Sequence, residues 1–259
     1  MQKAGLIVAM RREGRPLLRH VGRRSRRMMA GRACWRFELS GIDCVLVHCG
    51  IGLERAKAAA ASLIEAESPA LIISFGVAGG AEESLQAGDV VAAENVILHE
   101  GGPSASPLPL SPLSPAEFSA AARAVSARGS ALYRGTVITT RGSQVAPGQA
   151  ADLVHPVLDM ETYGIAQEAA RRGIPLLSLR ALSDSVREPL PFDLAALSDA
   201  DHTFHPGRLL AQLIAHPGIL PRLSKLRRNT RRAEENAAIA VMAVLAGPGS
   251  HPAPGQPGT

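Results

Sequence analysis

Aromatic side chains are scarce in this sequence. Only 3% of its 259 residues are Phe, Trp or Tyr, whereas 46% are hydrophobic. A core of this composition must be filled by Ala, Leu, Val and Ile, which suits helices packed on a buried sheet. The shortage also argues against a nucleic-acid surface, which uses aromatic rings to stack on bases. We therefore expect an α/β protein without a nucleic-acid partner.

Cysteines and long apolar runs are also few. Cys34, Cys44 and Cys49 have no metal-ligand spacing and form no even set, so neither a metal site nor a disulfide framework is expected. No run of 18 apolar residues is present, and the first residues lack the pattern of a signal peptide. The expected location is the cytoplasm, with reduced thiols and no metal or organic cofactor.

The net charge of +5 comes largely from two arginine-rich segments, residues 11–27 and 222–232. Solvated helix faces, a nucleic-acid surface and a patch for anionic lipid headgroups are the three explanations for such clusters. The lack of aromatics disfavours the second explanation. The sequence leaves the first and the third open.

Apolar runs and glycine turns alternate along the first 190 residues. Residues 44–75 read as a strand, a glycine turn, a helix and a second strand, and such a crossover requires parallel strands. The whole pattern predicts a three-layer α/β/α sandwich with a mixed central sheet. Its expected strands are 4–10, 44–48, 70–75, 88–98, 132–140 and 175–180, its expected helices are 53–66, 116–128 and 161–172, and 101–115 is expected to be a loop.

The pattern changes after about residue 200. Residues 205–246 are expected to form helices interrupted by Pro217 and Pro221, and the Gly- and Pro-rich residues 247–259 to be disordered. We therefore expect a main domain over 1–204, a C-terminal helical extension over 205–246 that packs on it, and a disordered tail.

Open α/β sheets build their sites at the carboxyl ends of strands. One such strand end carries a carboxylate, and a second carries a Gly-x-Gly turn. A third carries a glycine-rich turn whose amides can approach a ligand. A fourth segment places two carboxylates beside a thioether. A fifth places a cation, a hydroxyl and a carboxylate close together. Each alone has a structural explanation, such as an Arg180–Glu161 ion pair or an Asp184 that caps a turn. The five segments are Ala9–Glu13, Gly50–Gly52, Phe75–Gly80, Asp159–Glu161 and Arg180–Asp184.

Taken together and in this order, the segments resemble the purine nucleoside phosphorylase and nucleosidase superfamily over roughly residues 4–190. Its nucleosidase branch acts on methylthioadenosine and S-adenosylhomocysteine and carries four similar motifs. These are Ala-Met-x-x-Glu, Ala-Gly-Gly, Asp-Met-Glu and Arg-Ala-x-Ser-Asp, which stand here at 9–13, 78–80, 159–161 and 180–184. The resemblance implies a nucleoside phosphorylase-like domain that cleaves the N-glycosyl bond of a purine nucleoside.

The chemistry of that reaction suits these residues. Cleaving an N-ribosyl bond builds positive charge on the sugar and leaves electrons on the departing base, so a carboxylate and an acid are both needed. By resemblance, Asp184 protonates the base, and Glu161 and Met160 hold the ribose. Ser183 would position Asp184, and Arg180 would orient the carboxylates and the nucleophile. The expected substrate-binding residues also include Val77, Ala78 and Gly79.

The nucleophile is open at this point. Glu13 stands where the nucleosidase pattern has its base, which favours water. Arg11, Arg12 and Arg55 lie near the same strand ends and would suit inorganic phosphate as a co-substrate. The sequence therefore allows a hydrolase or a phosphorylase.

Two departures from the nucleosidase pattern point to another substrate. Residues 139–145 contain no Phe to stack on adenine, and Val77 replaces a small polar residue. Residues 209–223 and 73–80 are similar to hopanoid-associated phosphorylases, which implies release of adenine from adenosylhopane in hopanoid biosynthesis, giving ribosylhopane or phosphoribosylhopane. The alternatives are a methylthioadenosine/S-adenosylhomocysteine nucleosidase, a non-catalytic nucleoside-binding protein and a peripheral membrane protein.

The expected partners follow from that interpretation. A lipid-linked substrate would require contact with the inner face of the membrane, where the basic C-terminal helices could meet anionic headgroups. The alternative is that these helices only pack on the sheet. Relatives complete their sites with a neighbouring subunit, so a homodimer is expected.

Overall fold

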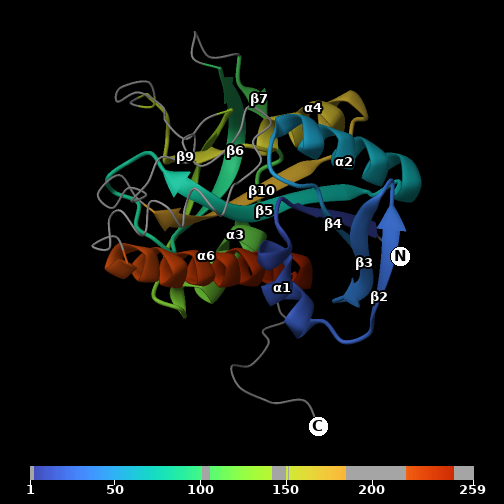
Figure 1. Cartoon of the computed structure of the whole chain (residues 1–259), viewed down its shortest axis with the longest axis horizontal. Coiled ribbons are helices and arrows are strands. Elements are labelled where there is room, and N and C mark those ends of the chain that lie inside the picture. Colours follow the sequence, from blue (N-terminus) through green and yellow to red (C-terminus); the bar gives the residue numbers. More distant parts are fainter. Residues whose placement is uncertain (1–2, 101–105, 142–149, 151, 185–219, 248–259) are drawn as a thin grey trace.

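The computed structural model describes residues 3–100, 106–141, 150, 152–184 and 220–247. Strands and helices alternate along most of this part of the chain (Figure 1). In chain order the elements are β1 (Lys3–Val8), α1 (Arg11–His20), β2 (Arg24–Met29), β3 (Arg32–Leu39), β4 (Ile42–His48), α2 (Leu53–Glu67), β5 (Leu71–Gly80), β6 (Val90–His99), β7 (Leu108–Pro109), α3 (Pro115–Ser126), β8 (Leu132–Thr140), β9 (Pro156–Asp159), α4 (Thr162–Arg171), β10 (Leu176–Asp184) and α6 (Leu220–Ala246).

The strands form one mixed sheet in the order β10-β6-β8-β9-β5-β1-β4-β3-β2, with β7 beside β6. β1 pairs in parallel with both β4 and β5, so the predicted parallel crossover through α2 is confirmed. β10 also pairs with β5, so that the five strands β5, β10, β6, β8 and β9 form a closed ring of paired strands. The predicted mixed sheet is confirmed, and its closed half was not foreseen.

Helices cover both faces of the sheet. α1, α3 and α6 lie together on one side, and α2 and α4 lie on the other, as Figure 1 shows. Side chains along β1 alternate between the two layers: Leu6 and Val8 join the core beneath α1 and α6, whereas Ile7 joins the core beneath α2. The three-layer prediction is therefore confirmed.

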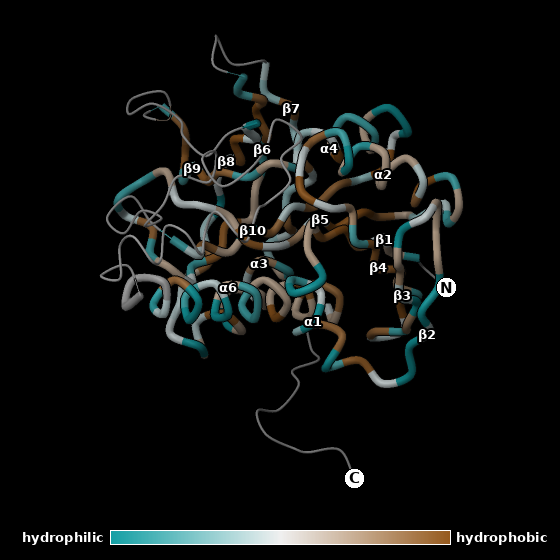
Figure 2. The backbone as a smooth tube through the Cα atoms, in the orientation of Figure 1, coloured by the Kyte–Doolittle hydropathy of each residue, from teal (hydrophilic) through white to brown (hydrophobic). Residues whose placement is uncertain are grey.

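Alanine lets these helices lie close to the strands. Ala56, Ala59 and Ala60 of α2 and Ala237 and Ala240 of α6 are all completely buried. Figure 2 shows the hydrophobic segments gathered along the central strands β1, β4 and β5, with hydrophilic segments on β2. The expectation of an aliphatic core with few aromatic rings agrees with this packing.

The arginine-rich N-terminal segment is only partly helical. Its first half forms α1, but Arg24, Arg26 and Arg27 lie in β2, an exposed edge strand that pairs with β3. The explanation by helix faces is therefore wrong for this half. Charged side chains on an edge strand protect it from pairing with another chain. No apolar alternation marks β2, because none of its residues is buried.

The described part of the C-terminal region is one continuous helix, α6. Pro221 lies in its first turn and does not interrupt it, since the first helical residues need no intrahelical N–H bond. Asn236 fixes the helix by donating to the Gly88 carbonyl at 2.7 Å and accepting from Arg128 Nε at 2.7 Å. Pro217 and residues 205–219 lie outside the described residues, as do residues 248–259. Within the described part, no helix is both long and apolar enough to cross a membrane.

Candidate active site

Glu13 lies at the first turn of α1, directly after β1. Its side chain is buried and accepts hydrogen bonds from the backbone N–H of Val77 at 3.0 Å and of Met10 at 2.7 Å. Gly76 makes this position possible, because a Cβ there would lie 2.6 Å from Glu13 Oε1. The glycine-rich segment expected to be a turn is therefore the C-terminal part of β5, and it is this part of the strand that holds the Glu13 carboxylate.

The parallel pairing of β5 with β10 places two predicted segments side by side. Arg180 is opposite Gly76, and Asp184 is opposite Gly79, with an irregularity in the ladder between Leu182 and Asp184. This bulge contains Ser183, whose hydroxyl donates to Asp184 Oδ1 at 2.5 Å. Bulges of this kind re-aim side chains beside functional sites. Here it turns Asp184 toward Gly79, where an added Cβ would lie 3.3 Å from Asp184 Oδ2.

Glu161 is the residue that precedes α4, and it is buried. Its Oε1 accepts from the backbone N–H of Gly52 at 2.8 Å, and its Oε2 accepts from the Met160 N–H at 3.3 Å. Gly52 has a φ of 106°, a left-handed value that favours glycine. The Gly-x-Gly turn after β4 therefore positions Glu161.

Arg180 is held rigidly in the centre of the site. Its Nε donates to Asp159 Oδ2 at 3.0 Å, and its Nη2 donates to the hydroxyls of Ser74 and Thr162, both at 2.7 Å. Asp159 in turn accepts from Thr139 Oγ1 at 2.6 Å. The ion pair that the sequence allowed between Arg180 and Glu161 is therefore formed with Asp159 instead.

Burial controls the charge of the carboxylates. It raises the pKa of Glu13, although two backbone N–H donors and the Arg180 charge oppose the shift. Burial also raises the pKa of Glu161, with a further rise from the Asp159 charge. The pKa of Asp184 is raised by burial as well, while the Ser183 hydrogen bond lowers it in part. Each carboxyl group thus holds its proton to a higher pH than an exposed one.

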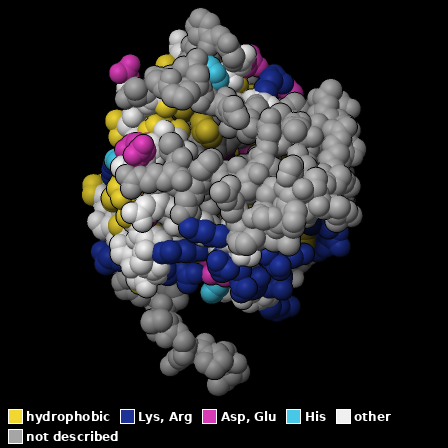
Figure 3. Space-filling model, turned by 60° about the vertical axis from the view of Figure 1, so that its left-hand side comes forward, with side chains coloured by type: hydrophobic (Ala, Val, Ile, Leu, Met, Phe, Trp, Pro, Cys, Tyr) yellow, Lys and Arg dark blue, Asp and Glu magenta, His cyan; other side chains and the backbone are white. Residues whose placement is uncertain are grey.

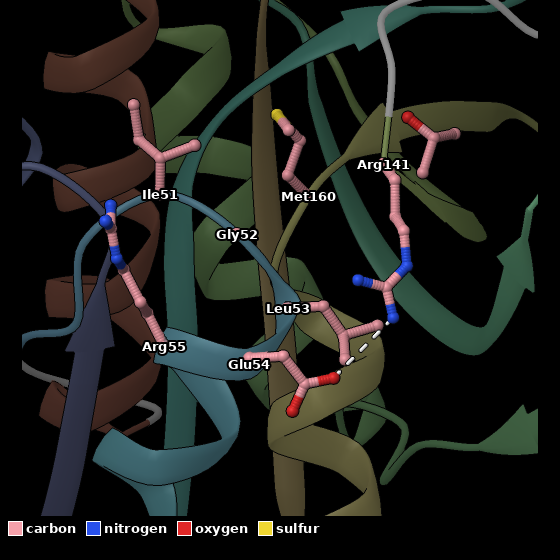
Figure 4. A pocket seen from close by; sticks show the side chains of 8 residues that line it. Ile51, Gly52, Leu53, Glu54, Arg55, Arg141 and Met160 are labelled. Atoms are coloured by element: carbon pink, nitrogen blue, oxygen red, sulfur yellow. Dashed lines mark ion pairs between the residues drawn. The ribbon is translucent and has the colours of Figure 1, made fainter. Parts of the chain in front are cut away.

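Met160 lies in a pocket between the N-terminal turn of α2 and the end of β8 (Figure 4). The Ile51, Leu53 and Met160 side chains supply its apolar part. Its rim carries an ion pair between Arg141 and Glu54 at 3.6 Å, drawn as a dashed line in Figure 4. The pocket can therefore hold a mainly apolar group beside the Glu161 carboxylate.

The structure brings most of the predicted site residues together. The charges of Glu13, Glu161 and Arg180 all act on the Cys49 thiol, whose pKa is raised by burial and then by the two glutamates. Asp184 and Ser183 lie on the Gly79 side of β5, and Val77 and Ala78 lie between these two groups on the same strand.

Sequence reasoning missed the residues that hold Arg180. Ser74, Thr139 and Thr162 have no motif of their own, although Thr139 and Asp159 stood in segments singled out for other reasons. Among the described residues, no group of three or more His, Cys, Asp or Glu side chains could hold a metal ion.

Comparison with known proteins identifies the family. Residues 3–215 match the model of the phosphorylase superfamily. The chain belongs to this superfamily. The predicted membership is therefore confirmed, and with it the prediction of an enzyme that cleaves N-glycosyl bonds.

Similar curated proteins include nucleosidases. The 5'-methylthioadenosine/S-adenosylhomocysteine nucleosidase of Shewanella halifaxensis is 30% identical over 206 residues, which are 74% of this chain and 90% of the relative. That of Chromohalobacter salexigens is 30% identical over 199 residues, covering 71% of this chain and 85% of the relative. The narrower resemblance to hopanoid-associated phosphorylases finds no support in these relatives.

Solved structures share the fold. The nucleosidase of the same name from Colwellia psychrerythraea, in complex with adenine, superposes with a TM-score of 0.70 at 21% identity and covers 94% of each chain. The futalosine hydrolase of Helicobacter pylori superposes with a TM-score of 0.68 at 15% identity, covering 94% of this chain and 97% of that one. At these identities the likeness concerns the fold alone.

Proposed function

We propose that this enzyme hydrolyses the N-glycosyl bond of a 5'-substituted adenosine, releasing adenine. The observation that carries the proposal is that two buried carboxylates, Glu13 and Glu161, both lie within reach of the charge of the fixed Arg180 guanidinium. A third carboxyl group, Asp184, lies farther along the same pair of strands. This arrangement offers separate groups for the water, the sugar and the base.

The proposed reaction is a displacement at the anomeric carbon of the ribose. Water attacks C1' and gives a proton to Glu13, while the bond from C1' to the purine nitrogen breaks. Asp184 gives its proton to the five-membered ring of the purine, so that adenine leaves as a neutral molecule. The raised pKa of both groups suits these roles, since it makes Glu13 a stronger base and lets Asp184 hold its proton to a higher pH than an exposed aspartate does.

Glu161 and Met160 are proposed to hold the sugar. Glu161 accepts two backbone hydrogen bonds and would receive further ones from the ribose hydroxyls, which strengthen as positive charge develops on the ring. The Arg180 charge opposes the rise that burial causes in the pKa of both glutamates, and so favours their charged forms. It acts from a fixed position, because Asp159 and two hydroxyls hold its guanidinium.

The names of the relatives point to a thioether at the 5' position, and the pocket beside Met160 supports this choice. Its apolar residues Ile51, Leu53 and Met160 would accept a methylthio group without leaving a polar atom unpaired. The prediction of adenosylhopane rested mainly on residues 209–223, most of which lie outside the described residues. Methylthioadenosine is therefore the first substrate to test.

Membrane contact remains a proposal that rests on charge alone. Figure 3 shows lysine and arginine side chains gathered across the lower part of the face that it draws. Lys225, Arg227 and Arg228 of α6 are exposed basic residues. The buried face of the C-terminal half of the helix, with Ala237 and Val241, packs on the protein core. Because the protein core covers that face, attraction to lipid headgroups would have to act without insertion of the C-terminal half of α6 into the membrane.

A substrate panel tests the proposed function. Adenine release is measured from methylthioadenosine, S-adenosylhomocysteine, adenosine and an adenosyl-lipid, with the Glu161→Gln variant as the control for binding of the ribose. We expect methylthioadenosine to have the highest kcat/KM and Glu161→Gln to lower kcat/KM by about 100-fold, since hydrogen bonds that strengthen in the transition state contribute about 2.7–4 kcal/mol. Release from none of these nucleosides would refute the proposal, and release from the adenosyl-lipid alone would refute the choice of substrate. A homodimer is also proposed and is tested by light scattering.

A further inference from the structure

The proposed base, Glu13, lies in a segment that is rich in arginine. Arg11 and Arg12 precede it in α1, and Arg15 follows shortly after it. Positive charge beside a carboxylate favours its charged form and therefore makes it a weaker base. The Arg12 charge acts on Glu13 in this direction, as does the Arg180 charge from β10. A base in these surroundings keeps its affinity for a proton only if negative charge lies nearby.

The C-terminal helix α6 supplies such a charge. It packs against α1, as Figure 1 shows, and its Glu234 side chain is buried, with 9% of the residue exposed. Glu234 Oε1 lies 3.0 Å from Arg12 Nε. This oxygen has no hydrogen-bond partner among the described residues, so its contact with Arg12 is an attraction between charges. A carboxylate of α6 thus pairs with the guanidinium that directly precedes Glu13 in the sequence.

Glu234 and Glu13 also act on each other. α6 packs on β5, whose Val77 N–H binds Glu13 Oε1, and on β10, which carries Arg180. The Glu13 charge raises the pKa of Glu234. Because repulsion between two charges is mutual, Glu234 disfavours the charged form of Glu13 as well. Glu234 therefore opposes the arginines twice, once by pairing with Arg12 and once by its own charge.

Other titratable groups near these two glutamates come from several elements. Glu161, before α4, and Cys49, after β4, both have their pKa raised by the charge of the proposed base. Arg15 of α1 lowers the pKa of Glu234, and Glu235 of α6 raises it. Glu161 and Cys49 belong to the site itself, whereas Glu234 acts on the site from the C-terminal helix.

We propose that Glu234 is a positioning residue for the reaction: through its ion pair with Arg12 it offsets the arginine charge and keeps Glu13 able to take a proton from water. This inference rests on the proposed function, in which Glu13 is the base. It gives α6 a part in the chemistry, although the groups proposed to act on the substrate all come from other elements.

The test is the pH dependence of kcat, measured with the nucleoside that has the highest kcat/KM. Glu13 works while it is charged, so kcat rises with pH through its pKa. Glu234→Gln leaves the Arg12 charge without its counter-charge, so this acidic limb should move down by about 0.5–1 pH unit, and Arg12→Gln should move it up by a similar amount. The double variant loses both charges together and should have its limb within about 0.3 unit of the parent protein.

The matched control is Glu235→Gln, at the next residue of the same helix. Its carboxylate pairs with Arg128 at 2.6 Å and with Arg231 at 3.3 Å, so the substitution removes the same charge from a different set of ion pairs. The control should leave the limb within about 0.2 unit, as expected for partly exposed pairs. A lower kcat or melting temperature of Glu234→Gln with an unmoved limb would show a structural role alone and would overturn the inference.

A second measurement separates this inference from the proposed function. NMR titration of the protein labelled with ¹³C in its glutamate carboxyl groups reports the pKa of Glu13 without turnover, and the spectrum of Glu13→Gln identifies the signal. Opposite shifts of this pKa in the two single variants, with a kcat profile that does not follow them or with no activity, would refute Glu13 as the base and leave its coupling to α6 in place.

A Glu13 pKa that stays unchanged in both single variants, or that moves in the same direction in both, would overturn the inference whatever the activity. Equal movement in the Glu235→Gln control would do the same. Arg12 is 54% exposed, so its variant should fold even if the Glu234 variant does not, and it then tests the coupling by itself.

Discussion

Replacing Asp184 by Asn should remove the proposed acid without disturbing its surroundings. The two side chains have nearly the same shape, and among the described residues Asp184 contacts Ser183 and Gly79. Because burial already favours the neutral form of Asp184, a neutral amide should change the free energy of unfolding by less than about 0.5 kcal/mol. A positioned general acid contributes about 10²–10⁴ in rate, which is about 3–5 kcal/mol of activation free energy. Adenine release should therefore fall by that factor with an unchanged melting temperature.

The pH dependence gives a sharper form of the same test. The Ser183 hydroxyl donates to Asp184 and lowers its pKa, so Ser183→Ala should raise that pKa further. The acid works while it is protonated, which means that kcat falls as the pH rises through its pKa. The alkaline limb of the kcat profile should thus move upward by about 1–2 pH units, since a hydrogen bond to a charged group contributes about 1.5–3 kcal/mol and 1.36 kcal/mol corresponds to one unit. A limb that stays in place, or near-normal turnover of Asp184→Asn, would refute the role of Asp184.

Three further substitutions test how the carboxylates are held. Gly76→Ala places a Cβ 2.6 Å from Glu13 Oε1, so it should lower the free energy of unfolding by about 1–3 kcal/mol, measured in urea, and reduce kcat because Glu13 must move. Asp159→Asn leaves the buried Arg180 without its partner and should cost about 3–5 kcal/mol in the same assay, so a change below 1 kcal/mol would contradict the assigned pair. Glu161→Gln removes a group whose raised pKa makes the folded state less stable as the pH rises through that pKa. This variant should therefore melt at a higher temperature than the parent protein at pH 9 and not at pH 4, and an equal difference in melting temperature at both pH values would contradict the shift.

The sequence predicted the strands β1, β4, β5, β6, β8 and β10 and the helices α2, α3 and α4, because apolar runs and glycine turns indicate local structure directly, whereas α1, β3, β7 and β9 were not among the expected elements. Those signals placed Glu13, Glu161 and Asp184 at the ends of strands, where the structure has them. The edge strand β2 was not predicted, since its exposed arginines show no alternation with buried residues. Its pairing with β3 is a tertiary effect that no local pattern records.

The network around Arg180 could not have been predicted for a related reason. Ser74, Thr139 and Asp159 come from three different strands, and their meeting depends on strand order and register. The pairing of β10 with β5, which closes half of the sheet, sets that register. The sequence accordingly allowed an ion pair between Arg180 and Glu161. In the structure Arg180 forms its ion pair with Asp159, and Glu161 accepts a hydrogen bond from the Gly52 N–H.

The most direct test of the account is the fate of the ribose when methylthioadenosine reacts in phosphate-free water enriched in ¹⁸O. The account predicts release of free adenine and one atom of ¹⁸O on the anomeric carbon of the sugar, with both signals lost in the Glu13→Gln variant. Mass spectrometry of the products reports the cleaved bond and the nucleophile together. Intact nucleoside after prolonged incubation, or cleavage that appears only when phosphate is supplied, would contradict a water-dependent nucleosidase.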